Sequence, residues 1–164
     1  MSRPLVWALL LVAACKADPS PPRPEPKASG SAPAPSRLEL VKAKDHVPVE
    51  IIVDEELARA KTTGQQVILY VGAPWCEPCR YFHEAAAAGK LDEAFPELRV
   101  IEFNLDDDEA RLEVAGCRSR MIPLFARVTS DGKCHPEHRI MGSVKGPGAI
   151  ANITPRLRSL LATP

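Results

Sequence analysis

From residue 37 onward, apolar and β-branched runs alternate with stretches that have helical spacing or helix-capping residues. The apolar runs predict five strands, at Val47–Val53, Gln66–Val71, Arg99–Leu105, Leu124–Val128 and about His138–Ser143. Four helices are expected, at Glu55–Lys61, from Cys76 to about Ala88, at Glu109–Ala115 and from Thr154 to about Leu161. The order β-α-β-α-β-α-β-β-α predicts an α/β domain with a central mixed sheet and helices on both faces.

Turn and cap residues indicate where several of these elements begin or end. Asp54 is expected to cap the first helix, and Gly89 is expected to end the second. The dipeptide Asp131-Gly132 is typical of a hairpin turn between the last two strands. Thr154 followed by Pro155 is typical of a cap and a first-turn proline, so the last helix is expected to begin there.

The first 15 residues have the pattern of an export signal. Arg3 supplies a positive start, and Leu5–Ala14 is an uncharged apolar run that is too short to span a bilayer as a mature helix. Small residues then lead directly into Cys15, and this junction resembles a bacterial lipobox. We therefore predict a signal peptide at 1–14 and a lipid-modified Cys15. An ordinary signal peptide cut after Ala14 is the alternative.

Residues 15–36 are predicted to be a lipidated cysteine followed by a Pro-rich linker. Residues 16–36 lack large apolar side chains, so they cannot bury enough surface to offset the entropy of ordering. Their prolines favour an extended spacer between a membrane and a folded domain at 37–164. Lys16 follows the lipid-modified cysteine where many inner-membrane lipoproteins have aspartate, which slightly favours the outer membrane and a periplasmic domain.

Composition excludes two broad classes of protein. Apolar residues make up 45% and charged residues 26% of the 164 residues, as in a soluble globular domain. The 21 basic residues are balanced by 21 acidic residues, which argues against a nucleic-acid-binding protein. The only long apolar run lies at the N-terminus, which excludes a polytopic membrane protein.

The candidate chemistry lies in a Cys-x-x-Cys motif that follows an apolar strand and opens a helix. Cys76 would lie at the helix N-terminus, where free N–H groups and the helix dipole stabilise a thiolate. Cys79 lies one turn further on and can attack a mixed disulfide formed at Cys76. Pro78 falls in the first turn, where its missing N–H has no cost, and Trp75 can shield the pair. No cofactor and no metal is assigned to this reaction.

Residues 67–79, with the sequence VILYVGAPWCEPC, resemble the active-site strand and loop of the thioredoxin family. The dipeptide Ile122-Pro123 before a predicted strand is similar to the cis-proline that lies beside the two cysteines in that family. The resemblance covers about residues 45–162. It implies a thioredoxin-like fold and a thiol–disulfide oxidoreductase.

By the same resemblance, Cys76 would be the attacking thiol and Cys79 the resolving thiol. Pro123 and Ile122 would present backbone to a substrate peptide, with Trp75 also positioning the substrate. An ordinary trans proline at the start of a strand is the alternative for Pro123.

Two positions depart from the family pattern. The strand before the motif has Tyr70 where thioredoxins have a buried aspartate, and the next strand has Glu102 where they tend to have lysine. Strand alternation places Val100, Glu102 and Asn104 on one face. We therefore hypothesise that Glu102 handles the proton of Cys79, because a buried carboxyl has a raised pKa suited to that task. A glutamate that faces water at the strand end is the alternative.

The residues between the cysteines bear on the direction of the reaction. Glu77 and Pro78 lack the histidine of strongly oxidising family members, and a negative Glu77 should raise the energy of the Cys76 thiolate. We therefore expect a reductase of disulfides in envelope proteins, which needs an integral-membrane electron donor. An oxidase or isomerase, a copper-binding chaperone and a non-catalytic binding module are the alternatives.

The other cysteines and the histidines carry weaker signals. Cys117 is expected near the active-site end and Cys134 at the far end of the strand Leu124–Val128, so a disulfide between them is doubtful. A zinc site would need a second ligand pair with a spacing similar to that of Cys-x-x-Cys, and Cys117 and Cys134 do not form one. The segment Cys134–His138 has metal-ligand residue types, but a solvated hairpin is expected there. His83 is expected on the surface, and His46 has no visible partner.

Overall fold

The computed structural model describes residues 37–162, so the signal peptide, Cys15 and linker predicted in residues 1–36 lie outside the described residues. The elements are β1 (Glu39–Lys42), α1 (Val49–Thr63), β2 (Gln66–Gly72), α2 (Glu77–Ala87), β3 (Leu98–Asn104), α3 (Leu105–Val114), β4 (Leu124–Val128), β5 (Cys134–Met141), a 3-10 turn η1 (Gly146–Gly148) and α4 (Ala149–Ala162). The predicted order of strands and helices is confirmed. No helix in the described part is long and apolar enough to cross a membrane.

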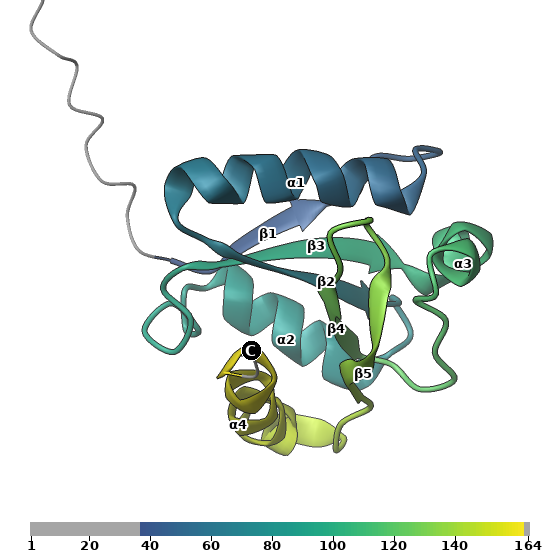
Figure 1. Cartoon of the computed structure of the whole chain (residues 1–164). Helices are drawn as coiled ribbons and strands as arrows, with labels where there is room; N and C mark the ends of the chain where they lie inside the picture. Colours follow the sequence, from purple (N-terminus) through teal and green to yellow (C-terminus); the bar gives the residue numbers. More distant parts are fainter. Residues whose placement is uncertain (1–36, 163–164) are drawn as a thin grey trace, which may run out of the picture. The chain divides into compact units, whose positions relative to one another are not determined.

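The five strands form one mixed sheet in the order β1-β3-β2-β4-β5. Strands β1, β3 and β2 are parallel, whereas β4 is antiparallel to β2 and β5 is antiparallel to β4. In Figure 1, α1 lies on one face of this sheet, and α2 and α4 lie on the other. The predicted mixed sheet with helices on both faces is therefore confirmed.

The buried side chains divide into two cores, one on each face of the sheet. Ile68 and Tyr70 of β2 pack in the core that contains α2 and α4, whereas Leu69 and Val71 pack in the core that contains α1 and α3. All four side chains are at most 1% exposed. The near-continuous apolar run of this strand is explained by burial on both faces.

The predicted strand at Val47–Val53 is wrong, because most of this segment lies in helix α1. Buried residues recur in α1 at helical spacing, at Val49, Ile52, Val53, Glu56 and Ala60. The β-branched residues at the start of this segment favour a strand locally, but packing of this face on the sheet overrides that preference. Pro48, rather than Asp54, is the N-cap residue.

The true first strand is the short edge strand β1, which the sequence pattern did not reveal. Three of its four residues are half-buried and the last is exposed, so it has no clear alternation. The buried Arg99 of β3 forms ion pairs with Glu39 of β1 and with Glu56 of α1. This cluster ties the edge strand and the first helix to the interior of the sheet.

Three predicted boundaries are corrected downstream. Helix α3 begins at Leu105 because the Asn104 side chain accepts a hydrogen bond from Asp106 N at 3.3 Å and so caps the helix. Strand β5 begins at Cys134 rather than at about His138. Helix α4 begins at Ala149, and Pro155 lies inside it at an exposed position rather than in its first turn.

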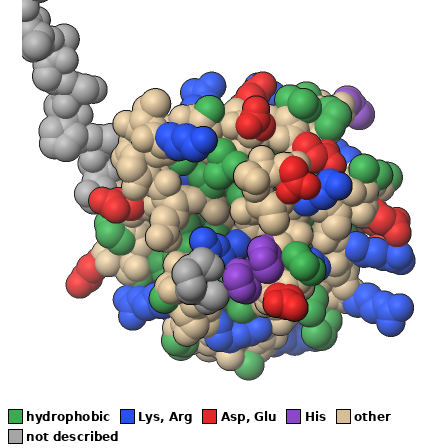
Figure 2. Space-filling view, in the orientation of Figure 1, with side chains coloured by type: hydrophobic (Ala, Val, Ile, Leu, Met, Phe, Trp, Pro, Cys, Tyr) green, Lys and Arg blue, Asp and Glu red, His purple; other side chains and the backbone are tan. Residues whose placement is uncertain are grey.

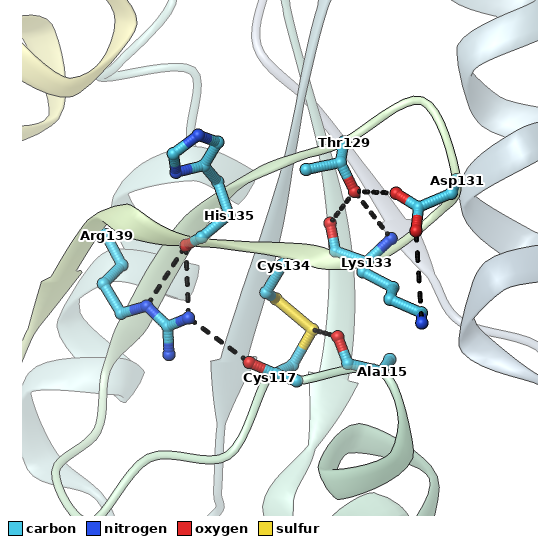
Figure 3. Close-up of a disulfide and its surroundings, with 9 residues drawn as sticks. Ala115, Cys117, Thr129, Asp131, Lys133, Cys134, His135 and Arg139 are labelled. Atoms are coloured by element: carbon cyan, nitrogen blue, oxygen red, sulfur yellow. Dashed lines mark hydrogen bonds and ion pairs between the residues drawn. A yellow bond between two sulfur atoms is a disulfide. The ribbon is translucent and has the colours of Figure 1, made fainter.

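Cys117 and Cys134 form a disulfide, with Cα atoms 5.1 Å apart (Figure 3), although the sequence made this pairing doubtful. That expectation placed Cys117 at the active-site end of the sheet. Helix α3 instead carries the chain back to the opposite end, where Cys134 N donates a hydrogen bond to Ala115 O at 3.0 Å. Both cysteines are buried, and Arg139 donates to the Gly116 carbonyl beside them.

We expect the Cys117→Ala/Cys134→Ala variant to be less stable than the parent protein by about 3 kcal/mol, because the bridge closes a loop of 17 residues in the unfolded chain. Urea denaturation followed by circular dichroism measures this change. Both proteins in this comparison carry Cys76→Ser/Cys79→Ser, so that they differ only in the Cys117–Cys134 disulfide. Equal denaturation midpoints would show that the bridge does not stabilise the fold.

Candidate functional site

The Cys-x-x-Cys motif lies where β2 ends and α2 begins. Cys76 is the N-cap residue of α2 and forms a disulfide with Cys79, with Cα atoms 5.2 Å apart. The Cys79 backbone N–H donates a hydrogen bond to Cys76 Sγ, with 3.3 Å between the nitrogen and the sulfur. The sulfur therefore caps the helix in place of the usual side-chain oxygen. Pro78 lies in the first helical turn, as expected. In the reduced protein, such donors stabilise a Cys76 thiolate.

Trp75 is the exposed neighbour of the disulfide. Its side chain is 65% exposed, whereas Cys76 and Cys79 are 4% and 3% exposed. The indole Nε1 donates to the two carboxylate oxygens of Asp106 at 3.0 and 3.1 Å. Asp106, at the start of α3, was not identified from the sequence as a site residue, because a strand and a helix separate it from the motif.

The Ile122–Pro123 peptide bond is cis, as the resemblance implied. Pairing of β4 with β2 matches Leu124 with Val71, so the chain enters β4 beside the end of β2 that leads into the cysteines. Gly142 N donates to the Pro123 carbonyl at 2.8 Å and holds the loop that follows β5 against this segment. Ile122 is half-buried next to it.

Tyr70 occupies the position that faces α2 beneath the disulfide. It is fully buried against Phe82 and Phe125, with ring centroids 5.0 Å from each, and its hydroxyl donates to the Cys79 carbonyl at 3.4 Å. Burial and the nearby Glu102 carboxylate raise the pKa of Tyr70 far above its ordinary value. The phenol therefore stays protonated near neutral pH and cannot act as a base there.

The residue at the end of β2 accommodates this tyrosine. A Cβ atom at Gly72 would lie 2.4 Å from the Tyr70 hydroxyl oxygen, which is closer than any real contact. Glycine at this position is therefore required by the inward-facing tyrosine two residues earlier.

Glu102 is the carboxyl group that lies on the same face as Tyr70. The two residues are register partners in the parallel β2–β3 pair, and both line a cavity of about 480 Å³ together with Cys79 and His83. The Glu102 side chain is 25% exposed, so it is partly buried and keeps some contact with solvent. The orientation that strand alternation predicted is supported by this cavity.

His83 is the close partner of Glu102. Its Nε2 atom lies 3.5 Å from Glu102 Oε2, although its side chain is 52% exposed on α2. Burial raises the pKa of Glu102, while the charges of His83 and Lys42 oppose this effect. Local sequence patterns do not reveal this pair, because a contact between α2 and β3 depends on how the helix packs on the sheet.

Glu77 lies beside Cys76 and reaches the loop after β5. Its Oε1 atom accepts a hydrogen bond from Gly146 N at 3.2 Å. The carboxylate therefore sits where it can raise the energy of a Cys76 thiolate, and the Gly146 N–H offsets part of its charge.

The other histidines do not join the site. His135 and His138 stack on each other, with ring centroids 3.9 Å apart on the edge strand β5. Within residues 37–162, no group of three or more His, Cys, Asp or Glu side chains is placed to hold a metal ion. His46 lies in the loop before α1 with a positive φ of 60°.

No protein-family model matches the sequence, and no curated protein matches it either. Among solved structures, the chain is similar to a thioredoxin of Trichomonas vaginalis, with 17% identity over 74% of this chain and 95% of that chain and a TM-score of 0.47. It is similar to a thioredoxin of Trypanosoma brucei brucei, with 18% identity over 76% and 93% and a TM-score of 0.45. Thioredoxin O1 of Arabidopsis thaliana shows 16% identity over 75% and 95%, with a TM-score of 0.44.

The chain has a thioredoxin-like fold, and this assignment rests on its own topology. The strand order β1-β3-β2-β4-β5, the disulfide at the N-terminus of α2 and the cis-proline before β4 occur together. The fold that the sequence resemblance implied is therefore confirmed.

We expect Glu102→Gln to slow turnover of a small disulfide substrate more than tenfold near neutral pH, because the variant cannot accept the Cys79 proton. In the parent protein, the rate should rise with pH as Glu102 ionises through its raised pKa, and the variant should lack this rise. Rates measured from about pH 5 to about pH 9 test both expectations.

Glu97→Gln is the matched control, since Glu97 is an exposed carboxyl just before the other end of β3. Burial favours the protonated form of Glu102, so its ionisation weakens folding as pH rises through the raised pKa. The Glu102→Gln variant should therefore be at least as stable as the parent at neutral pH. An unchanged rate and pH profile would exclude a proton-transfer role for Glu102.

Proposed function

We propose that the protein is a thiol–disulfide oxidoreductase that reduces disulfides in other proteins. The observation that supports this most strongly is the Cys76–Cys79 pair at the N-terminus of α2, beside the cis Ile122–Pro123 bond. A dithiol at a helix N-terminus has the thiolate that exchange requires. The adjacent backbone of Ile122 offers hydrogen-bonding groups to an extended substrate.

The reaction runs in two exchange steps. The Cys76 thiolate attacks a substrate disulfide, a mixed disulfide forms, and one substrate sulfur leaves as a thiolate. Cys79 then loses its proton, which we assign to Glu102, and its thiolate attacks Cys76 Sγ. The Cys76–Cys79 disulfide forms and the second substrate thiolate leaves. Two electrons have passed from the dithiol to the substrate, and an external dithiol must return them.

The direction of exchange follows from the charge beside Cys76. A carboxylate at Glu77 raises the energy of the thiolate and makes the dithiol a stronger reductant. The hydrogen bond from Gly146 N reduces this effect without removing the charge. An oxidase or isomerase would instead need a group that stabilises the reduced thiolate.

We expect the Cys76–Cys79 couple to have a reduction potential near or below about −230 mV, in the range of reductases. Equilibration of the Cys15→Ser chain with glutathione or dithiothreitol buffers, followed by thiol alkylation, measures it. The Cys76→Ser/Cys79→Ser variant controls for the buried Cys117–Cys134 bridge. A value between about −180 and about −120 mV would indicate an oxidase or isomerase. The absence of a reversible couple would favour a copper-binding or non-catalytic role.

The proposed setting is the bacterial cell envelope, with the domain tethered through a lipid on Cys15 and facing the periplasm. The Cys117–Cys134 disulfide supports this location, because structural disulfides persist in oxidising compartments and are rare in the cytosol. The substrates are then envelope proteins. The electrons come from an integral-membrane donor, because the envelope has no soluble cytosolic reductant.

We expect the full chain, expressed in a bacterium, to fractionate with membranes and to incorporate a radiolabelled fatty acid. Cys15→Ala should abolish labelling and release the protein to the soluble fraction, because the anchor is lost. Cys76→Ala is the matched control, since it also removes one cysteine but leaves the lipobox intact. Membrane association and labelling that survive Cys15→Ala would exclude this anchor.

A further inference from the structure

Two loops lead to or from the active-site end of the sheet, where β4 begins and β5 ends. One loop spans residues 115–123 and ends at the cis-proline, and the other spans residues 142–146 after β5. Gly142 N donates to Pro123 O at 2.8 Å, and Gly146 N donates to Glu77 Oε1 at 3.2 Å. The two loops are therefore joined to each other and to the first turn of α2, and we call them the active-site loops.

Most of the exposed large apolar side chains surround these cysteines. Within residues 37–162, the structure has six such side chains, and four of them belong to the motif, to the active-site loops or to the end of β5 beside them. These four are Trp75 (65% exposed), Met121 (57%), Val144 (49%) and Met141 (38%). A concentration of exposed apolar groups at one place indicates a surface that binds another molecule.

The charge on the active-site loops has one sign. They contain Arg118, Arg120 and Lys145, and neither loop contains an aspartate or glutamate. Arg118 pairs with Glu113 of α3 at 2.9 Å. Arg120 and Lys145 are exposed, and neither forms a hydrogen bond or ion pair with any residue in the described ranges.

The carboxylates next to the loops accept hydrogen bonds from neutral donors and keep their charge. Glu77 accepts from Gly146 N, and Asp106 accepts from the Trp75 indole. In Figure 2, basic side chains project from the edge of the molecule along which the loop between α3 and β4 runs. Arg120 and Lys145, which have no ion-pair partner among residues 37–162, thus lie on the loops that carry the exposed side chains of Met121 and Val144.

We propose that the preferred substrates carry acidic residues next to the disulfide that is reduced. This inference rests on the proposed function. The apolar side chains would contact the substrate around its disulfide, while Arg120 and Lys145 would attract carboxylates on the flanking residues. Exposed charge pairs contribute little each, and their main effect is on the rate of encounter at low salt. We expect each cation to change the rate about threefold.

The test uses three synthetic peptides that share one disulfide loop and differ only in flanking residues, which are Asp/Glu, Gln or Lys. The second-order rate constant for oxidation of the reduced full chain, with Cys15→Ser, is measured for each peptide. We expect the acidic peptide to react about tenfold faster than the neutral peptide at low ionic strength, and this ratio should fall as salt is added. The lysine peptide should react more slowly than the neutral one.

Arg120→Gln/Lys145→Gln should bring the acidic-to-neutral ratio close to one. Lys61→Gln/Lys90→Gln is the matched control, because it removes two exposed cations, one in the last turn of α1 and one just after α2, at the opposite end of the sheet, and it should leave the ratio unchanged. Circular dichroism and the reduction potential should be the same in all three proteins. A change in potential would show that the substitutions act on the dithiol rather than on substrate recognition.

The outcomes separate the two proposals. If the neutral peptide is reduced but the acidic peptide has no advantage, the charge preference is wrong and the oxidoreductase function stands. If the advantage survives Arg120→Gln/Lys145→Gln, or is lost equally in the control, these two cations are not its source. If no peptide oxidises the reduced protein, the proposed function itself fails.

Discussion

The structure depends on the position of β2, which is buried on both faces and paired along both edges. Parallel pairing with β3 and antiparallel pairing with β4 leave this strand no freedom to shift, because a slip of one residue would move its apolar side chains to the wrong core. The end of β2 fixes where α2 begins, and it therefore fixes Cys76. The same pairing fixes the start of β4, which sets Pro123 beside the cysteines. Two segments that lie far apart in sequence become one site through strand register.

Tyr70 on β2 determines which groups can exchange a proton with Cys79. Tyr70 fills the space below α2, donates to the Cys79 carbonyl and remains protonated, so this strand supplies no carboxylate near the resolving thiol. Its register partner Glu102, on the neighbouring strand, places a carboxyl group on the cavity that Cys79 also lines. Because Glu102 borders a cavity and contacts the partly exposed His83, its proton has a route to solvent. A fully buried carboxylate would lack such a route.

Sequence reasoning succeeded where local pattern and final environment agree. The strand β2 has a continuous run of large, mainly apolar side chains at 67–71 because both of its faces are buried beyond its first residues, and Cys76 caps a helix that its own neighbours favour. It failed where tertiary packing determines the secondary structure of a segment or the contact between two side chains. The segment at 49–53 has β-branched residues yet forms a helix, since its buried positions recur every three or four residues on the sheet surface. The contact between His83 and Glu102 depends on the packing of α2 on β3, which no local pattern encodes.

The two disulfides of this domain must differ in reactivity, because one exchanges with substrates and the other stabilises the fold. In the proposed reduction, Cys76 must be a thiolate, while the bridge between Cys117 and Cys134 must stay oxidised. Exchange requires an attacking sulfur to reach the disulfide. Strand β4 prevents this, because it begins beside the active site and its last residue, Val128, pairs with Cys134. Five strand residues span roughly 17 Å, so the thiolate of one molecule cannot attack its own second disulfide. The path of α3, which returns Cys117 to the far end, therefore keeps the Cys117–Cys134 crosslink out of reach of the exchanging Cys76–Cys79 pair.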